Sequence, residues 1–331
     1  MSHNISKLEL YFAPIDIKKI HPNSVITFDL YLKSGEKFLL YKSRNLQIQF
    51  DDIQRLLDNL VETLYIHNND KKHFRDYLEG NLENILKADH VSNHKKAEAL
   101  HESAINVIED IFSNPRSGEV IQRSRAIIGH TVDFILDTPE SFANLLKIRK
   151  YDYYTYTHSV NVCTFLVSLA RELGIEDKTV LKQIGEGGLL HDLGKSRIPS
   201  AIINKPGKLV KAEWEIIKMH PTYGVEIAKE TREIAEISLN IIGQHHEKPS
   251  GEGYPDGLKR GELNTFANMA SIVDVYDAIT TSRSYSAARP PIDAAQFLLE
   301  HKDEFNEKIL LKFIKMLVVK PTEEKKAHDP K

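Results

Sequence analysis

The stretch that decides the fold runs from residue 180 to residue 195 and reads VLKQIGEGGLLHDLGK. Its apolar residues recur with the period of a helix and lead directly into His191-Asp192, and Gly194 closes the segment. An imidazole and a carboxylate at the apolar end of a helix are costly unless they are paired or bound to a cation. The stretch therefore predicts a helical core that contains a polar site.

The same pattern recurs along the rest of the C-terminal two-thirds of the chain. Helical periods dominate from residue 119 onward, and no strand pattern of comparable strength occurs there. A helical bundle builds metal sites from side chains that project inward from facing helices. Further polar residues fall on or beside these apolar helical segments, namely His158, His220, His245, His246 and Asp274.

Each of these residues has a simpler explanation when it is taken alone. His158 could be a hydrogen-bonded core histidine, Asp274 could pair with an arginine, and His220 could cap the preceding helix. Adjacent His-Asp and His-His pairs at apolar helix positions in one domain favour a metal site instead. Mixed imidazole and carboxylate ligands suit iron, manganese or zinc better than magnesium or calcium.

The N-terminal region predicts a smaller α+β domain over residues 1–118. Two alternating segments, 25–32 and 37–41, flank a polar turn that contains Gly35, which indicates a hairpin. Asp51 or Asp52 is expected to cap a helix with apolar positions from Ile53 to Leu64. Amphipathic helices are expected at 72–86 and 95–112. The segment 113–118 contains Pro and Gly and is the best linker, so that the metal-binding domain would span 119–331.

Composition excludes several classes of protein. The 331 residues carry 44 Lys+Arg and 47 Asp+Glu, a net charge of -3 that gives no hint of a DNA-binding surface. The one cysteine, Cys163, lies in an apolar helical run and fits a reducing compartment. Charged residues interrupt every apolar run near the N-terminus, and no run could span a bilayer. We therefore expect a cytoplasmic protein.

Specific motifs resemble those of the HD-GYP proteins, a subfamily of the metal-dependent HD phosphohydrolases. His191-Asp192-Leu193-Gly194-Lys195 matches the HD signature, and residues 245–255, HHEKPSGEGYP, resemble the HD-GYP signature. The segments Lys205-Pro206-Gly207, His220-Pro221-Thr222-Tyr223-Gly224 and Asp274-Val275-Tyr276-Asp277-Ala278 match in the family's order. The similarity covers about residues 150 to 290. A chance match of this many motifs in the family's order is very unlikely, so the resemblance is specific.

The resemblance implies a cyclic di-GMP phosphodiesterase with two transition-metal ions, most often iron, alternatively manganese. Asp192 would bridge the two metals and, with Lys195, serve catalysis. Two close metals would activate a water and neutralise the phosphodiester. The implied metal ligands are His158, His191, Asp192, His220, His245, His246 and Asp274. The implied substrate contacts are Lys195, Arg283, Asp152 and Tyr285. The loop residues Gly253, Tyr254 and Pro255 would form a structural turn or dock diguanylate cyclase (GGDEF) partners.

Three positions depart from the family pattern. Tyr154 stands where some members carry a glutamate that supports a third metal, which favours two metals here. Ser250 replaces an Asp or Asn, and Ser286 replaces a cation that would bind phosphate. A lost charge-assisted contact is worth about 1.5 to 3 kcal/mol. The alternative function is therefore a weak or inactive module that binds nucleotide or recruits partners, and a general nucleotide phosphohydrolase is a third.

Overall fold

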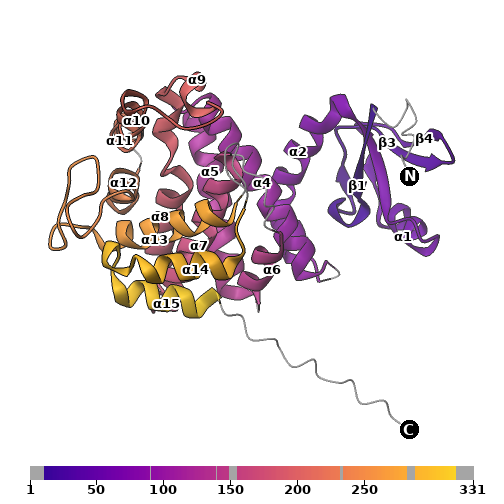
Figure 1. The fold of residues 1–331 in the computed structure, drawn as a ribbon. Coiled ribbons are helices and arrows are strands. Elements are labelled where there is room, and N and C mark those ends of the chain that lie inside the picture. The colour runs from indigo at the N-terminus through magenta and orange to yellow at the C-terminus, as the bar shows by residue number, and fades with distance from the viewer. Residues whose placement is uncertain are drawn as a thin grey trace, which may run out of the picture. The chain divides into compact units, whose positions relative to one another are not determined.

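The computed structural model describes residues 11–89, 91–138, 140–148, 155–231, 234–281 and 288–317. The chain divides into two compact units, Met1–Arg149 and Lys150–Lys331, which are described separately below. Figure 1 shows strands near the N-terminus followed by helices. No helix in these described ranges is both long enough and apolar enough to cross a membrane.

The first unit contains a four-stranded antiparallel sheet in the order β1-β6-β3-β4. The predicted hairpin is confirmed between β3 (Leu30–Ser34) and β4 (Lys37–Lys42), and Gly35 takes a positive φ of 60° in the turn. Its first strand begins at Leu30 rather than at Val25. β1 (Phe12–Asp16) pairs with β6 (Thr63–His67). A second, two-stranded sheet joins β2 (Ser24–Val25) to β5 (Gln47–Ile48).

The helix expected to reach Leu64 is shorter than predicted. α1 spans Phe50–Asp58, and Asp52 sits inside it, accepting a hydrogen bond from the Gln49 N–H rather than starting the helix. Leu60 is 89% exposed with a φ of 59°, so the chain has left the helix there. Leu64 is buried in strand β6 instead. The prediction was wrong because the apolar residues after Asp58 follow the strand period.

The described residues of the first unit also form further helices. They are the 3-10 helices η2 (Ile17–Lys19) and η3 (Asn68–Asp70) and the α-helices α2 (Lys71–Gly80), α3 (Leu82–Lys87), α4 (Asn93–Ser113), α5 (Gly118–Asp137) and α6 (Ser141–Ile148). Arg123 of α5 donates hydrogen bonds to Glu79 of α2 at 2.7 Å and to Asp110 of α4 at 2.8 Å. α4 also packs against α5 and α6. The expected linker, 113–118, therefore lies between two helices of one unit, and the boundary between the two units lies later in the chain, at 149/150.

The described part of the second unit is helical, with one isolated β-bridge between Ser250 and Lys259. This confirms the mainly α prediction for the C-terminal domain. Its elements are α7 (Thr155–Glu172), α8 (Lys178–Leu190), the 3-10 helix η4 (Leu193–Arg197), α9 (Ser200–Ile203), α10 (Lys211–Ile217), α11 (His220–Glu230), α12 (Glu236–Gln244), α13 (Thr265–Thr280), α14 (Pro291–Glu300), η5 (Lys302–Glu304) and α15 (Glu307–Leu317).

Aromatic packing joins α7 and α13, which carry His158 and Asp274, to α15. Phe165 of α7, Tyr276 of α13 and Phe313 of α15 form a triangle of edge-to-face contacts, with centroids 5.2 to 5.9 Å apart. All three side chains are buried. Cys163 is also buried in α7, and burial raises the pKa of its thiol to about 12. The cysteine therefore behaves as a small apolar residue, as expected.

Glycines allow the backbone around His191-Asp192 to approach its neighbours. A Cβ at Gly188 would collide with Leu166 of α7, and one at Gly187 would collide with Ile241 of α12. A Cβ at Gly194 would overlap the carbonyl oxygen of His220 and the backbone nitrogen of Gly224. The turn after Asp192 thus rests directly on the backbone of α11, which sets the position of His220.

Substitution of Gly194 by alanine should therefore destabilise the second unit. We expect a loss of at least about 2 kcal/mol, because backbone atoms cannot move aside as a flexible side chain can. Gly261→Ala is the control, since a Cβ there meets nothing within 4 Å. Urea unfolding of both variants measures the difference, and equal stability of the two would contradict this packing.

Candidate metal centre

The structure brings together every residue that the sequence predicted as a metal ligand. The contributing segments are α7, the C-terminal end of α8, the first turn of α11, the end of α12, and α13. Six of the seven residues are buried, and His246 is half-buried. They are His158, His191, Asp192, His220, His245, His246 and Asp274. Two sets of three in this cluster have ligand atoms within 4.8 Å of one another.

The first set consists of His158, His191 and Asp192. The Nε2 atom of His191 lies 3.4 Å from Oδ2 of Asp192, and Nε2 of His158 lies 3.9 Å from the same oxygen. Asp274 adjoins this set, because its Oδ1 is 3.0 Å from His158 Nε2. Two imidazole nitrogens and two carboxylates therefore face one small volume.

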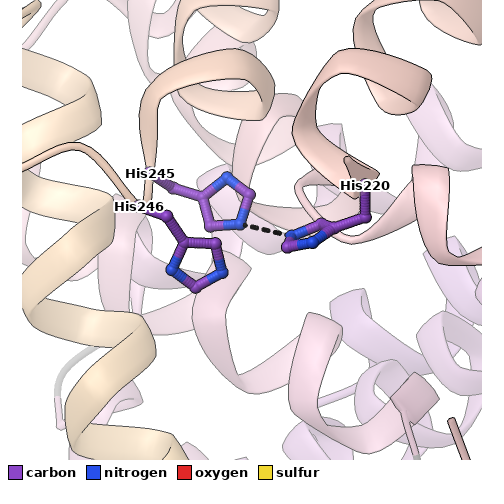
Figure 2. A group of neighbouring side chains, drawn as sticks. All are labelled: His220, His245 and His246. Carbon is purple, nitrogen blue, oxygen red and sulfur yellow. Dashed lines mark hydrogen bonds between the residues drawn. The ribbon is translucent and has the colours of Figure 1, made fainter. Parts of the chain in front are cut away.

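The second set consists of His220, His245 and His246. Figure 2 shows His245 and His246 reaching from one segment toward His220 on another, and the Nε2 atoms of His220 and His245 are 3.1 Å apart. Asp192 Oδ1 lies 3.4 Å from His220 Nε2. One oxygen of Asp192 thus faces the first set and the other faces the second.

Backbone carbonyls orient three of the histidines. Nδ1 of His191 lies 2.8 Å from the Gly188 oxygen, and Nδ1 of His220 lies 2.8 Å from the Ile217 oxygen. Nδ1 of His245 lies 3.0 Å from the Ile242 oxygen. A carbonyl only accepts, so each Nδ1 carries the proton and each Nε2 keeps a lone pair for a metal.

Burial keeps the imidazoles of His220, His245 and His246 neutral, whereas the carboxylates of Asp192 and Asp274 stay charged. Burial lowers the pKa of His220 to about 3 and that of His246 to about 4, and it lowers the pKa of His245 well below its usual range. Burial would raise the pKa of Asp192, but the nearby Lys195 ammonium outweighs it and holds the pKa well below its usual range. Metal ligands must be deprotonated, so the groups are in the required state.

The donor set fits a transition metal. Among the described residues, His191 Nε2 and Asp192 Oδ1 are buried atoms without a hydrogen-bond partner. Such groups are costly to bury unless a cation joins them. The Nε2 atoms of His220 and His245 also direct their lone pairs toward each other at 3.1 Å, and a cation bound to both would remove the repulsion between them. Imidazole and carboxylate donors match iron, manganese or zinc.

Among the predicted substrate contacts, Lys195 lies at the centre. Its Nζ donates to Asp192 Oδ2 at 2.7 Å, and its side chain is 20% exposed, so solvent reaches it. The other predicted contacts, Asp152, Arg283 and Tyr285, lie outside the described residues. The departures Tyr154 and Ser286 lie outside them as well, whereas Ser250 is on an exposed turn.

The loop that contains Gly253, Tyr254 and Pro255 forms one wall of the centre. Tyr254 stacks on His246 with ring centroids 4.7 Å apart, and a Cβ at Gly253 would overlap the backbone of Glu247. The Glu247 carboxylate accepts three backbone N–H bonds of 2.7 to 3.0 Å from residues 256–258. This role of Glu247 was not predicted from the sequence, although the position of Glu247 directly after His245-His246 was a usable signal.

A family model described as "HD domain" matches residues 140–309. A cyclic di-GMP phosphodiesterase of Pseudomonas aeruginosa is 32% identical over 229 residues, covering 69% of this chain and 55% of the relative. A 3'3'-cGAMP-specific phosphodiesterase of Vibrio cholerae is 35% identical over 147 residues, covering 44% of this chain and 31% of the relative. The chain thus spans between about a third and about half of the length of these relatives.

A solved structure shares the fold. It is described as an HDG"Y"P protein from Bdellovibrio bacteriovorus, with a TM-score of 0.65 and 23% identity, and the match covers 92% of this chain and 99% of that one. The family model and the names of the relatives support a phosphohydrolase enzyme that binds divalent metal.

Removal of Asp192 tests the arrangement of the centre. Because each of its oxygens faces a different set of histidines, Asp192→Ala should lose metal from both positions rather than from one. Elemental analysis of the purified protein measures the content, with Asp256→Ala, an exposed acid of the neighbouring loop, as the control. Full metal content in Asp192→Ala would contradict a shared ligand.

Acid should destabilise the metal-free protein. His220 has a pKa of about 3 in the folded chain against 6.5 in the unfolded one, so the unfolded state binds more protons between these values. Stability therefore falls as the pH drops below 6.5. His220 alone should cost about 2 kcal/mol at pH 5. Urea unfolding in the presence of chelator at pH 7.5 and pH 5 measures this, and equal stability at both would contradict a buried neutral His220.

Proposed function

The chain belongs to the HD domain family, and from this premise we propose that it is a metal-dependent cyclic di-GMP phosphodiesterase of the HD-GYP type. The HD-GYP resemblance predicted from the motifs is confirmed by the family model and the curated relatives. The observation that carries the proposal is the place of Asp192, with one oxygen 3.4 Å from His191 and the other 3.4 Å from His220. A carboxylate so placed can serve two metal positions.

The residues of the centre would have different roles in phosphodiester hydrolysis. The first position would be held by His158, His191, Asp274 and Asp192, and the second by Asp192, His220, His245 and His246. Two bound transition metals, iron or alternatively manganese, would supply Lewis acidity and activate water. Lys195 is close to Asp192 and partly exposed, so its Nζ can contact a phosphate oxygen as a point charge.

The substrate proposal rests on the names of the relatives. The Pseudomonas aeruginosa relative is named for cyclic di-GMP, whereas the Vibrio cholerae relative is named for 3'3'-cGAMP. We choose cyclic di-GMP, which would also contact Arg283, Asp152 and Tyr285. The first unit carries no such donor set among its described residues, and we assign it a regulatory or interaction role. The single buried cysteine fits the reducing cytoplasm as the location.

Ser286 and Ser250 favour a second candidate function. With one phosphate-binding cation missing, the domain could act as a weak or inactive module that binds nucleotide or recruits diguanylate cyclase (GGDEF) proteins. Gly253, Tyr254 and Pro255 would then form the docking surface. Tyr254 lies against His246, and Gly253 lies against the backbone of Glu247. A partner docked on this loop would therefore contact residues that pack against the predicted metal centre.

A restored cation distinguishes the two functions. We expect slow cyclic di-GMP hydrolysis by the native chain and roughly a tenfold or greater gain in Ser286→Arg, because a charge-assisted contact to phosphate is worth about 1.5 to 3 kcal/mol. Ser284→Arg is the matched control, with the same change two residues away. Adding Lys195→Ala should abolish the gain, since two cations would hold the phosphates.

Nucleotide turnover and binding are measured on metal-replete protein. Fast turnover by the native chain would show that the cation at position 286 is not needed. Absence of nucleotide binding by Ser286→Arg at full metal content would instead support the docking function.

A further inference from the structure

Asp277 is a buried carboxylate to which the sequence analysis assigns no role and which lies outside the predicted ligand set. It lies on α13 three residues after Asp274 and is 0% exposed. Its Oδ2 is 2.7 Å from Nδ1 of His158, and its Oδ1 accepts a hydrogen bond of 3.0 Å from the amide of Asn161. His158 and Asn161 occupy one face of α7, so α7 presents two polar groups to one carboxylate.

His158 is thereby placed between two carboxylates. Asp277 faces its Nδ1 at 2.7 Å, and Asp274 faces its Nε2 at 3.0 Å. A neutral imidazole donates from only one of its nitrogens. If the proton were on Nε2, it would point at Asp274 and remove the lone pair that a metal needs.

We propose that Asp277 is a positioning residue that fixes the proton of His158 on Nδ1, so that Nε2 and Asp274 both face the metal position. This inference rests on the proposed dimetal centre. An ionised carboxylate can only accept, so Oδ2 requires an N–H from His158. The Asn161 amide fixes the other oxygen, and the Thr281 hydroxyl adds a bond of 3.3 Å to Oδ2.

His158 differs in this respect from the other oriented histidines. Nδ1 of His191, His220 and His245 faces a backbone carbonyl, which no substitution can remove. His158 lies within α7, where the carbonyls are engaged in the helix, and depends on a side chain instead. A carboxylate partner also raises the basicity of a ligating imidazole. The first metal position is therefore sensitive to a single residue outside the ligand set.

Exchange of two side chains tests this role. In Asp277→Asn, the Asn161 amide favours the oxygen of Asn at position 277, which turns the new NH2 toward His158 and moves its proton to Nε2. In the double variant Asp277→Asn with Asn161→Asp, the NH2 would instead donate to the carboxylate at position 161. The amide oxygen would then accept from His158 Nδ1–H. The exchange keeps the composition of the site and restores the tautomer.

Calorimetric titration with Mn²⁺ alone measures the affinity of each metal position and does not depend on enzyme activity. The native protein should bind two ions, Asp277→Asn should bind one of them about 10 to 100 times more weakly, and the double variant should recover most of that affinity. Asp256→Asn, the same change of side chain at an exposed residue of the loop, should bind like the native protein. The proposal is overturned if Asp277→Asn binds both ions with native affinity or if the exchange restores nothing.

A second measurement needs no variant of Asp277. Ring ¹H–¹⁵N NMR spectra of the native protein loaded with diamagnetic Zn²⁺ should show His158 protonated on Nδ1, and protonation on Nε2 would overturn the proposal. Binding of fewer than two Mn²⁺ ions by the native chain would count against the proposed dimetal centre itself. Absent hydrolysis with two ions bound would count against the proposed substrate and leave the role of Asp277 in place.

Discussion

The second unit is organised around the cost of burying charge and unpaired nitrogen atoms in a helical core. Asp192 is 1% exposed and ionised, and burial keeps the neighbouring His220 imidazole neutral. Lys195 is the cation that contacts it among the described residues, and it reaches only one of the two oxygens. The other oxygen and His191 Nε2 have no hydrogen-bond partner there. A metal cation would bind these unpaired atoms, so that metal binding would stabilise the folded unit.

Helix ends supply much of the precision of the centre. The last carbonyls of a helix have no partner within the helix, and at α8 and α12 the histidine that follows uses them. His220 uses the Ile217 carbonyl at the end of α10 in the same way. Each histidine therefore obtains its tautomer from its own local backbone. The packing of Gly194 on the backbone of α11 then brings two such ends together.

The loop after His246 connects the centre to the surface. Glu247 gathers three backbone N–H groups of residues 256–258, and Tyr254 covers one face of the His246 ring. Burial raises the pKa of the Tyr254 hydroxyl, which therefore stays neutral beside Asp192 and Asp274. A substrate or a partner protein that contacts this loop would touch Tyr254, which packs against the predicted metal ligand His246. In both proposed functions, the bound molecule would contact this same loop.

The sequence by itself determined the helical character of the second unit and the seven-residue donor set, because periodicity reveals which polar residues fall on apolar faces. It also determined the β3–β4 hairpin, whose turn is local. It did not reveal strand β6 or the contacts of Glu247 and Asp277. These depend on contacts between different segments, and His158 and Asp277, for example, are 119 residues apart in the chain. Local patterns encode period and burial, whereas only tertiary packing decides which buried donor meets which acceptor.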